Sequence, residues 1–107
     1  LMIKIKIFRQ NDGKISGFSV AGHAGTAEYG QDIVCAAVSA LAQTALLGVG
    51  KHLHRRLEYK VASGDLYMKL KDEPDELTEA ILATMTLGFL EIENINPQSV
   101  RILEHRR

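Results

Sequence analysis

The sequence predicts an α+β fold of two layers, in which two helices pack on one sheet and the elements follow the order ββαββαβ. Three observations predict it: an apolar and polar alternation at the start of the chain, two stretches with apolar residues at helical spacing, and further alternation after each of these stretches. With 107 residues, the chain is long enough for one packed core and too short for two. We therefore expect a single domain over residues 1–107.

Two hairpins and a last strand make up the predicted sheet. The first strand has an isoleucine at every second position: Ile3, Ile5 and Ile7. The sequence NDGK at residues 11–14 tolerates positive φ and predicts a tight turn, and SGD at residues 63–65 predicts a second one. The strands expected from these patterns are residues 2–9, 15–21, 57–62, 66–70 and 100–103.

The first helix is expected to begin at Ile33, with Asp32 as its N-cap, after a glycine-rich loop over residues 22–30. Its inward face falls at helical spacing: Val34, Val38, Leu41 and Ala45. Residues 33–50 carry no charge, which raises the question of a transmembrane helix. Polar and glycine residues interrupt the stretch, so we predict a core helix instead.

The second helix is expected to open at Pro74, and Asn96 and Pro97 are expected to end it. Acidic residues at its start suit the positive end of the helix dipole. Its predicted inward stripe is Leu77, Ile81, Met85, Phe89 and Ile92.

Composition narrows the function classes. Lys and Arg number 13 and balance 13 Asp and Glu, so no global field draws the chain to nucleic acid or to an anionic membrane. Any such contact needs a local patch. One cysteine cannot form an internal disulfide, and the N-terminal residues do not resemble a signal peptide. We therefore expect a cytoplasmic protein with no membrane contact.

The candidate for chemistry is Cys35, which occupies the third position of the first helix if Asp32 is the cap. The free amides of a helix start favour a thiolate, and the thiolate is the nucleophile. His23 lies twelve residues earlier, at the start of the glycine-rich loop. A loop that returns to the helix start can bring this imidazole within hydrogen-bonding reach of the sulfur, as cysteine catalysis requires. A small core cysteine and a loop histidine satisfied by backbone groups are the alternatives.

Two sequence blocks are more specific than this spacing. GHAG at residues 22–25 and GQDIVCAAVSAL at residues 30–41 resemble the signature of the ribosomal-processing cysteine protease family. The resemblance extends over the whole chain in size and in the order of the strands and helices. It implies an endopeptidase that removes a short N-terminal extension from the precursor of the twenty-seventh protein of the large ribosomal subunit.

The resemblance also implies roles for individual residues. The nucleophile falls on Cys35 and the general base on His23, while Asp32 is a helix cap and possible orienting residue. Ser39 is a packing or substrate-contact residue. Gly22, Gly25 and Tyr29 belong to the loop that is expected to admit an extended peptide. Family members typically form homodimers, and the mechanism requires no metal or other cofactor.

Three other interpretations remain open. His23, Cys35, His52 and His54 could form a metal site, although no CxxC or HExxH motif supports it. The basic cluster at residues 51–56 could touch RNA, which would make the protein a non-enzymatic ribosome-associated module, binding RNA or protein, with an inert core cysteine. A redox-sensing thiol is the third, and no second cysteine is present to resolve a sulfenic acid.

Overall fold

The chain forms seven main elements in the predicted order. A computed structural model describes residues 2–22, 29–62 and 64–106, and for residues 29–32 it describes the backbone. The elements are β1 (Ile3–Arg9), β2 (Ile15–Ala21), α1 (Tyr29–Leu47) with a π-helical turn η1 (Gly48–His52), β3 (Leu57–Ala62), β4 (Asp65–Leu70), α2 (Glu76–Ile95) and β5 (Val100–Arg106). The predicted α+β fold with the order ββαββαβ is therefore confirmed.

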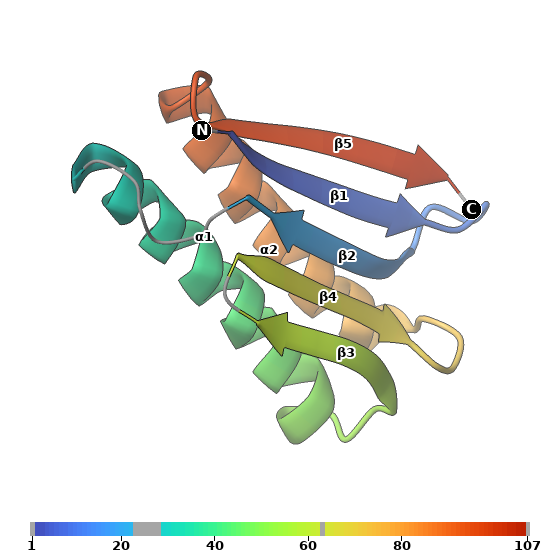
Figure 1. Cartoon of the computed structure of the whole chain (residues 1–107). Helices are drawn as coiled ribbons and strands as arrows, with labels where there is room; N and C mark the ends of the chain where they lie inside the picture. The colour runs from blue at the N-terminus through green and yellow to red at the C-terminus, as the bar shows by residue number, and fades with distance from the viewer. Residues whose placement is uncertain (1, 23–28, 63, 107) are drawn as a thin grey trace.

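The five strands form one mixed sheet in the order β3-β4-β2-β1-β5. The two hairpins are antiparallel and so is the contact between β2 and β4, whereas β5 pairs with β1 in parallel. Both helices lie on one face of this sheet, and the other face is open (Figure 1). Parallel pairing of β5 is possible because α2 carries the chain back along the sheet before β5 begins.

The core lies between the helices and the covered face of the sheet. Ile3, Ile5 and Ile7 are fully buried, whereas Lys4 and Lys6 are exposed, as the alternation predicts. The rings of Phe18 on β2 and Phe89 on α2 meet edge to face, with centroids 6.4 Å apart. Packing of this kind adds to area burial, so these rings hold α2 against the centre of the sheet.

The first helix begins four residues earlier than predicted. Its backbone is helical from Tyr29, so Asp32 lies in the first turn and not at the N-cap, and Cys35 is its seventh residue and not its third. The predicted inward face is correct at Val34, Val38 and Ala45, which are buried, while Leu41 is half-buried. The prediction of Asp32 as the cap was wrong because three helical residues precede it in α1.

The prediction for the second helix was wrong at one position of its buried stripe. Asp75 is its N-cap, and its side chain accepts hydrogen bonds from the amides of Leu77 and Thr78. The Thr78 hydroxyl in turn accepts from the Asp75 amide, which completes a capping box. This arrangement turns Thr78 inward, at 1% exposure, and leaves Leu77 exposed, so the predicted stripe was wrong at Leu77. Met85 and Phe89 are buried as predicted.

The stretch Ile33–His52 is long and apolar enough to cross a membrane. Its buried side chains instead belong to the same core as the strands: Val34, Cys35, Val38, Ala42, Ala45 and Val49. The stretch therefore packs as the core helix that the sequence predicts.

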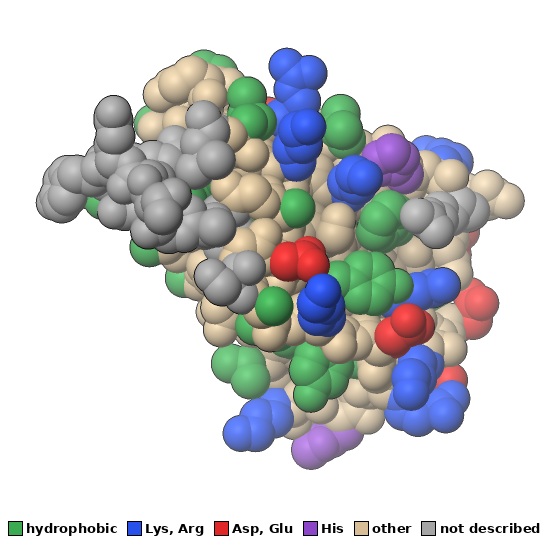
Figure 2. Space-filling view, viewed as in Figure 1, with side chains coloured by type: hydrophobic (Ala, Val, Ile, Leu, Met, Phe, Trp, Pro, Cys, Tyr) green, Lys and Arg blue, Asp and Glu red, His purple; other side chains and the backbone are tan. Residues whose placement is uncertain are grey.

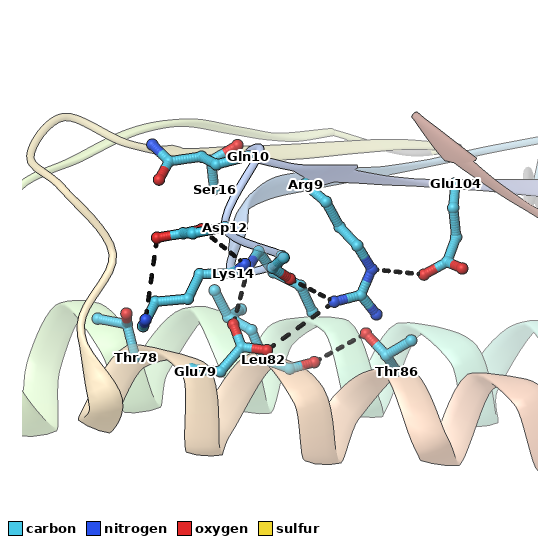
Figure 3. A network of polar contacts seen from close by, with 12 residues as sticks. Arg9, Gln10, Asp12, Lys14, Ser16, Thr78, Glu79, Leu82, Thr86 and Glu104 are labelled. Carbon is cyan, nitrogen blue, oxygen red and sulfur yellow. Dashed lines mark hydrogen bonds and ion pairs between the residues drawn. The ribbon is translucent and has the colours of Figure 1, made fainter. Parts of the chain in front are cut away.

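A polar network fixes the first hairpin at the far end of the sheet (Figure 3). The Arg9 side chain donates to Glu104 on β5 at 2.8 Å and to the Gly13 carbonyl at 2.8 Å. Glu79 on α2 accepts from the Ile15 amide at 2.8 Å. One charged cluster thus joins both edges of the first hairpin to α2 and β5, away from the start of α1 (Figure 1).

Candidate active site

Cys35 lies in the second turn of α1 and is 9% exposed. It belongs to the core cluster together with Val34 and Val38. In an α-helix the Cα–Cβ bond tilts toward the N-terminus, so the sulfur leans toward the first turn of α1. On its core side the sulfur is covered by the buried cluster, so we expect a substrate atom to reach it from the side of the helix start.

The start of α1 stabilises a thiolate at Cys35 less than the sequence led us to expect. The amides without an intrahelical partner belong to the start of α1, and the effect of the dipole falls off within the first turn. Cys35 lies beyond that turn. Activation of its thiol thus depends more on a neighbouring base than on the helix.

Ser39 lies one turn after Cys35 and is half-buried. Its hydroxyl accepts a hydrogen bond at 2.9 Å from the Gln43 side chain, one further turn along the helix. The sequence analysis missed Gln43 as the partner, although its spacing of four residues from Ser39 is the spacing at which helical side chains meet. This contact orients the Ser39 hydroxyl along the same helix that carries Cys35.

Gly22 directly follows β2, and its backbone conformation and contacts fix its position. Its φ is +91°, a conformation that favours glycine, and a Cβ here would lie 2.5 Å from the Met2 carbonyl oxygen. Its amide donates to the Gly64 carbonyl oxygen at 3.1 Å, in the turn that joins β3 to β4. Gly22 therefore directs the chain out of the sheet at a point held by two neighbouring segments, and β2 ends at the side of the sheet where α1 begins (Figure 1).

Four predicted site residues lie between Gly22 and Cys35: His23, Gly25, Tyr29 and Asp32. His23 and Gly25 lie outside the described residues, so their proximity to Cys35 stays a prediction. Tyr29 and Asp32 are described by their backbone, which places both in the first turn of α1, one to two turns before Cys35. The described chain thus brings the end of β2, which Gly22 follows, and the start of α1, which carries Cys35, to one end of the molecule (Figure 1).

The residues that suggested other interpretations lie elsewhere. Seventeen residues of helix separate Cys35 from His52, a distance of roughly 25 Å at the rise of an α-helix. These two side chains cannot hold the same metal ion. Within the described ranges, no group of three or more metal-ligating side chains comes together.

The basic cluster at residues 51–56 is partly neutralised. Arg55 pairs with Asp75 at 2.9 Å, and Arg56 pairs with Asp72. A hydrogen bond from the Arg56 guanidinium lowers the pKa of Asp72, while the pKa of Arg56 itself is raised by the same contact. Two of the cations that suggested RNA contact therefore serve as internal ion pairs.

Two hollows of the described surface are lined by residues other than Cys35. One of about 610 Å³ lies between the end of α2 and β5, and one of about 420 Å³ lies between the end of α1 and β3. The second is lined by Leu46, Leu47, Gly50, Lys51, Arg55, Leu57 and Tyr59. A peptide that reaches Cys35 is therefore not held by these two hollows alone.

Comparison with known proteins identifies relatives that span most of this chain. A family model described as cysteine protease Prp matches residues 2–101. The ribosomal processing cysteine protease Prp of Staphylococcus aureus (strain NCTC 8325 / PS 47) is 29% identical over 104 residues, which cover 94% of this chain and 97% of that protein. The protein of the same name from Bacillus subtilis (strain 168) is 50% identical over 40 residues, 37% of this chain and 36% of that one.

Solved structures show the same likeness. The crystal structure of the S. aureus ribosomal processing protease Prp in complex with a substrate peptide superposes with a TM-score of 0.89 at 25% identity, over 97% of this chain and 100% of that one. SMU.848 from Streptococcus mutans superposes with a TM-score of 0.88 at 25% identity, over 99% and 96% of the two chains.

Proposed function

We propose, from the premise that this chain belongs to the cysteine protease Prp family, that it removes the N-terminal extension of a large-subunit ribosomal protein precursor during ribosome assembly. The chain is a cysteine protease with the fold of that family. The observation that carries the substrate assignment is the match to the S. aureus protease, which is named for ribosomal processing and covers 94% of this chain. We propose that residues 1–107 act as one protease domain.

The catalytic step begins with the Cys35 thiolate. The sulfur attacks the carbonyl carbon of the scissile peptide bond and forms a tetrahedral intermediate, and His23 gives its proton to the leaving amine. The acyl-enzyme then reacts with water, from which His23 takes a proton, and the thiolate is released. Free amides in the first turn of α1 would stabilise the negative oxygen of the intermediate.

Stabilisation of the thiolate depends on His23 more than it would for a cysteine in the first turn of a helix. Cys35 lies in the second turn, where the helix dipole has weakened, so an imidazolium partner is needed to stabilise the thiolate at neutral pH. Asp32 lies in the first turn of α1 and is proposed to orient that imidazole, because a carboxylate beside an imidazolium holds it in position. Gly22, Gly25, Tyr29 and Ser39 are proposed to contact the peptide.

Mass spectrometry of the ribosomal protein precursor after incubation with this chain tests the substrate assignment. A defined N-terminal truncation is expected, with one new N-terminus. The same incubation with Cys35→Ala is expected to leave the precursor intact. An intact precursor with the unchanged protein, under conditions where it is folded, would contradict the proposed function.

A cytoplasmic homodimer is the proposed form of the enzyme. In support of it, the outer side of α2 exposes three large apolar side chains: Leu87 at 65%, Leu90 at 44% and Ile95 at 71%. A two-fold pairing of this helix with its copy would cover these side chains, because such an interface is self-complementary. Exposed patches of this kind mark interaction surfaces.

Light scattering coupled to gel filtration tests the dimer. The unchanged chain is expected to elute with twice its monomer mass, and Leu87→Glu is expected to elute as a monomer. Val61→Glu is the matched control, because Val61 is 50% exposed on the edge strand β3 and lies on a different surface. A monomeric unchanged chain, or equal dissociation by both variants, would refute the proposal for α2.

A further inference from the structure

The face of the sheet that the helices leave open carries its side chains in three rows. The register between strands sets the rows, since residues directly opposite each other share one face. From β5 to β3 the rows are His105, Phe8, Gly17, Lys69, Glu58; then Leu103, Lys6, Ser19, Tyr67, Lys60; then Arg101, Lys4, Ala21, Asp65, Ala62. Residues far apart in the sequence are thereby brought onto one surface.

This surface, which we call the open face, is basic although the chain as a whole is neutral. It holds five Lys and Arg side chains and two carboxylates. Lys60 and Asp65 pair with each other at 3.2 Å. The remaining cations are exposed, and in the described part of the chain none of them forms an ion pair: Lys4, Lys6, Lys69 and Arg101. Figure 2 shows Lys and Arg side chains spread over this face among apolar ones.

Aromatic rings lie among these cations. Phe8 and Tyr67 are half-buried on the strands β1 and β4, which flank β2. With Ser16 and Lys69 they line a hollow of about 40 Å³, and Gly17 between them has no side chain to fill it. His105 lies beside Phe8 with ring centroids 5.9 Å apart. The open face thus offers ring surfaces and a small hollow within reach of unpaired cations.

We propose that the open face binds single-stranded RNA, with Lys4, Lys6, Lys69 and Arg101 contacting phosphates and Tyr67 and Phe8 contacting bases. The cations match the charge of a phosphate backbone, and aromatic rings on a sheet accept unstacked bases irrespective of sequence. A second copy of this chain fits poorly, because pairing two open faces would place these cations against each other. The choice of RNA over DNA rests on the proposed function, since a protease that acts on a ribosomal protein works close to ribosomal RNA.

RNA on the open face would leave the catalytic centre free. Cys35 lies in the core cluster on the helix side of the sheet, and the open face lies on the opposite side. The RNA would hold the protease close to an assembling particle while the precursor reaches Cys35 from the helix start. The open face is therefore a tether, and its loss should not change cleavage of an isolated peptide.

Fluorescence anisotropy with a labelled uridine-rich RNA of about 12 nucleotides tests the proposal, because sites of this type span about 4–16 nucleotides. We expect binding that weakens with salt between about 50 and 200 mM, with a log–log slope of about −0.7 for each phosphate contacted. Lys6→Glu is expected to weaken binding roughly tenfold and to reduce the slope. Lys51→Glu is the matched control, since it makes the same charge change at an exposed position of η1.

Tyr67 separates base contact from simple charge attraction. Tyr67→Phe keeps a ring and is expected to bind RNA as the unchanged chain does, whereas Tyr67→Leu is expected to weaken binding roughly tenfold at equal net charge. Thermal melting of both variants shows that they are folded at the temperature of the assay. Equal weakening by Lys6→Glu and Lys51→Glu, or tight binding by Tyr67→Leu, would overturn the proposal.

Two further arms distinguish other partners. Sedimentation with vesicles of phosphatidylglycerol and phosphatidylcholine, without binding to RNA, would overturn the proposal in favour of an anionic membrane. Tighter binding to the matched DNA than to the RNA would overturn the choice of RNA.

Cleavage of a precursor peptide is measured in parallel. Cleavage without RNA binding refutes the open-face proposal alone, and RNA binding without cleavage refutes the proposed function alone.

Discussion

Replacing Cys35 by alanine separates a catalytic cysteine from a structural one. The side chain is 9% exposed and loses one heavy atom, the sulfur, in this change. The transfer free energy of one buried methylene-sized group is about 0.8 kcal/mol, so the unfolding free energy should fall by about 1 kcal/mol. For a chain of this size such a loss lowers Tm by roughly 4–8 °C. The variant should therefore remain folded at ordinary assay temperatures and show no cleavage.

Val38→Ala is the matched control on the same helix. Val38 is fully buried one turn after Cys35 and belongs to the same cluster. The change removes two buried methyl groups, so the unfolding free energy should fall by about 2 kcal/mol, which is more than for Cys35→Ala. The control is thus expected to be the less stable variant and the active one, as long as the assay runs below its Tm.

The assay is cleavage of a precursor peptide followed by mass spectrometry, with calorimetry of each variant. An inactive Cys35→Ala beside an active and less stable Val38→Ala places the chemistry on the sulfur. Retained cleavage in Cys35→Ala would refute the assignment of the nucleophile. Loss of cleavage in both folded variants would mean that activity depends on core packing in α1, and Cys35 would have no special role.

Four further outcomes are expected. His23→Ala should lower kcat by a factor of roughly 10² to 10⁴ in peptide cleavage, and a change in KM alone would make His23 a contact residue. Asp32→Asn should keep its Tm within a few degrees, because Asp32 is not the N-cap, and should lose most activity in the same assay; near-normal turnover would leave a Cys-His dyad. Gly22→Ala should lower Tm in calorimetry, because of the positive φ and the Met2 carbonyl oxygen 2.5 Å from the new Cβ, and an unchanged Tm would contradict this reasoning. The hydrogen bond from the Thr78 amide and the contact with Arg55 lower the pKa of the Asp75 carboxyl below 3.8. The ionised Asp75 should therefore stabilise the fold at neutral pH, and this stabilisation should be lost as the pH falls below 3.8. A Tm of Asp75→Asn that falls with acid as steeply as the Tm of the unchanged chain would refute this prediction.

Local patterns in the sequence were enough to predict most of the fold. The isoleucines at positions 3, 5 and 7 predict a strand with one buried face because a period of two has no helical counterpart. The buried face of α1 could be predicted at Val34 and Val38 for the corresponding reason at helical spacing. Such patterns depend on neighbours within one element, and the sequence contains them in full.

The predictions were wrong where a helix boundary or a polar contact decides which side chains of a helix face the core. Leu77 was expected inside, but the capping box uses both polar groups of Thr78 and so permits a threonine at 1% exposure. The start of α1 at Tyr29 could not be predicted because Gly30 and Asp32 suggested a loop and a cap. The rows of the open face could not be predicted either, since they depend on the strand order β3-β4-β2-β1-β5, which long-range pairing decides.

The corrected helix start changes which part of the site activates the thiol. A cysteine at the third helical position could rely on free amides, but a cysteine at the seventh has the first turn between itself and the helix end. Its sulfur still leans toward that turn, while Val34 and Val38 occupy the core beside it. The described chain therefore supports the nucleophile on its core side and leaves the helix start as the side from which we expect the base and the peptide. For this reason, activity should respond to changes at residues 22–32 far more strongly than to changes beyond Ser39.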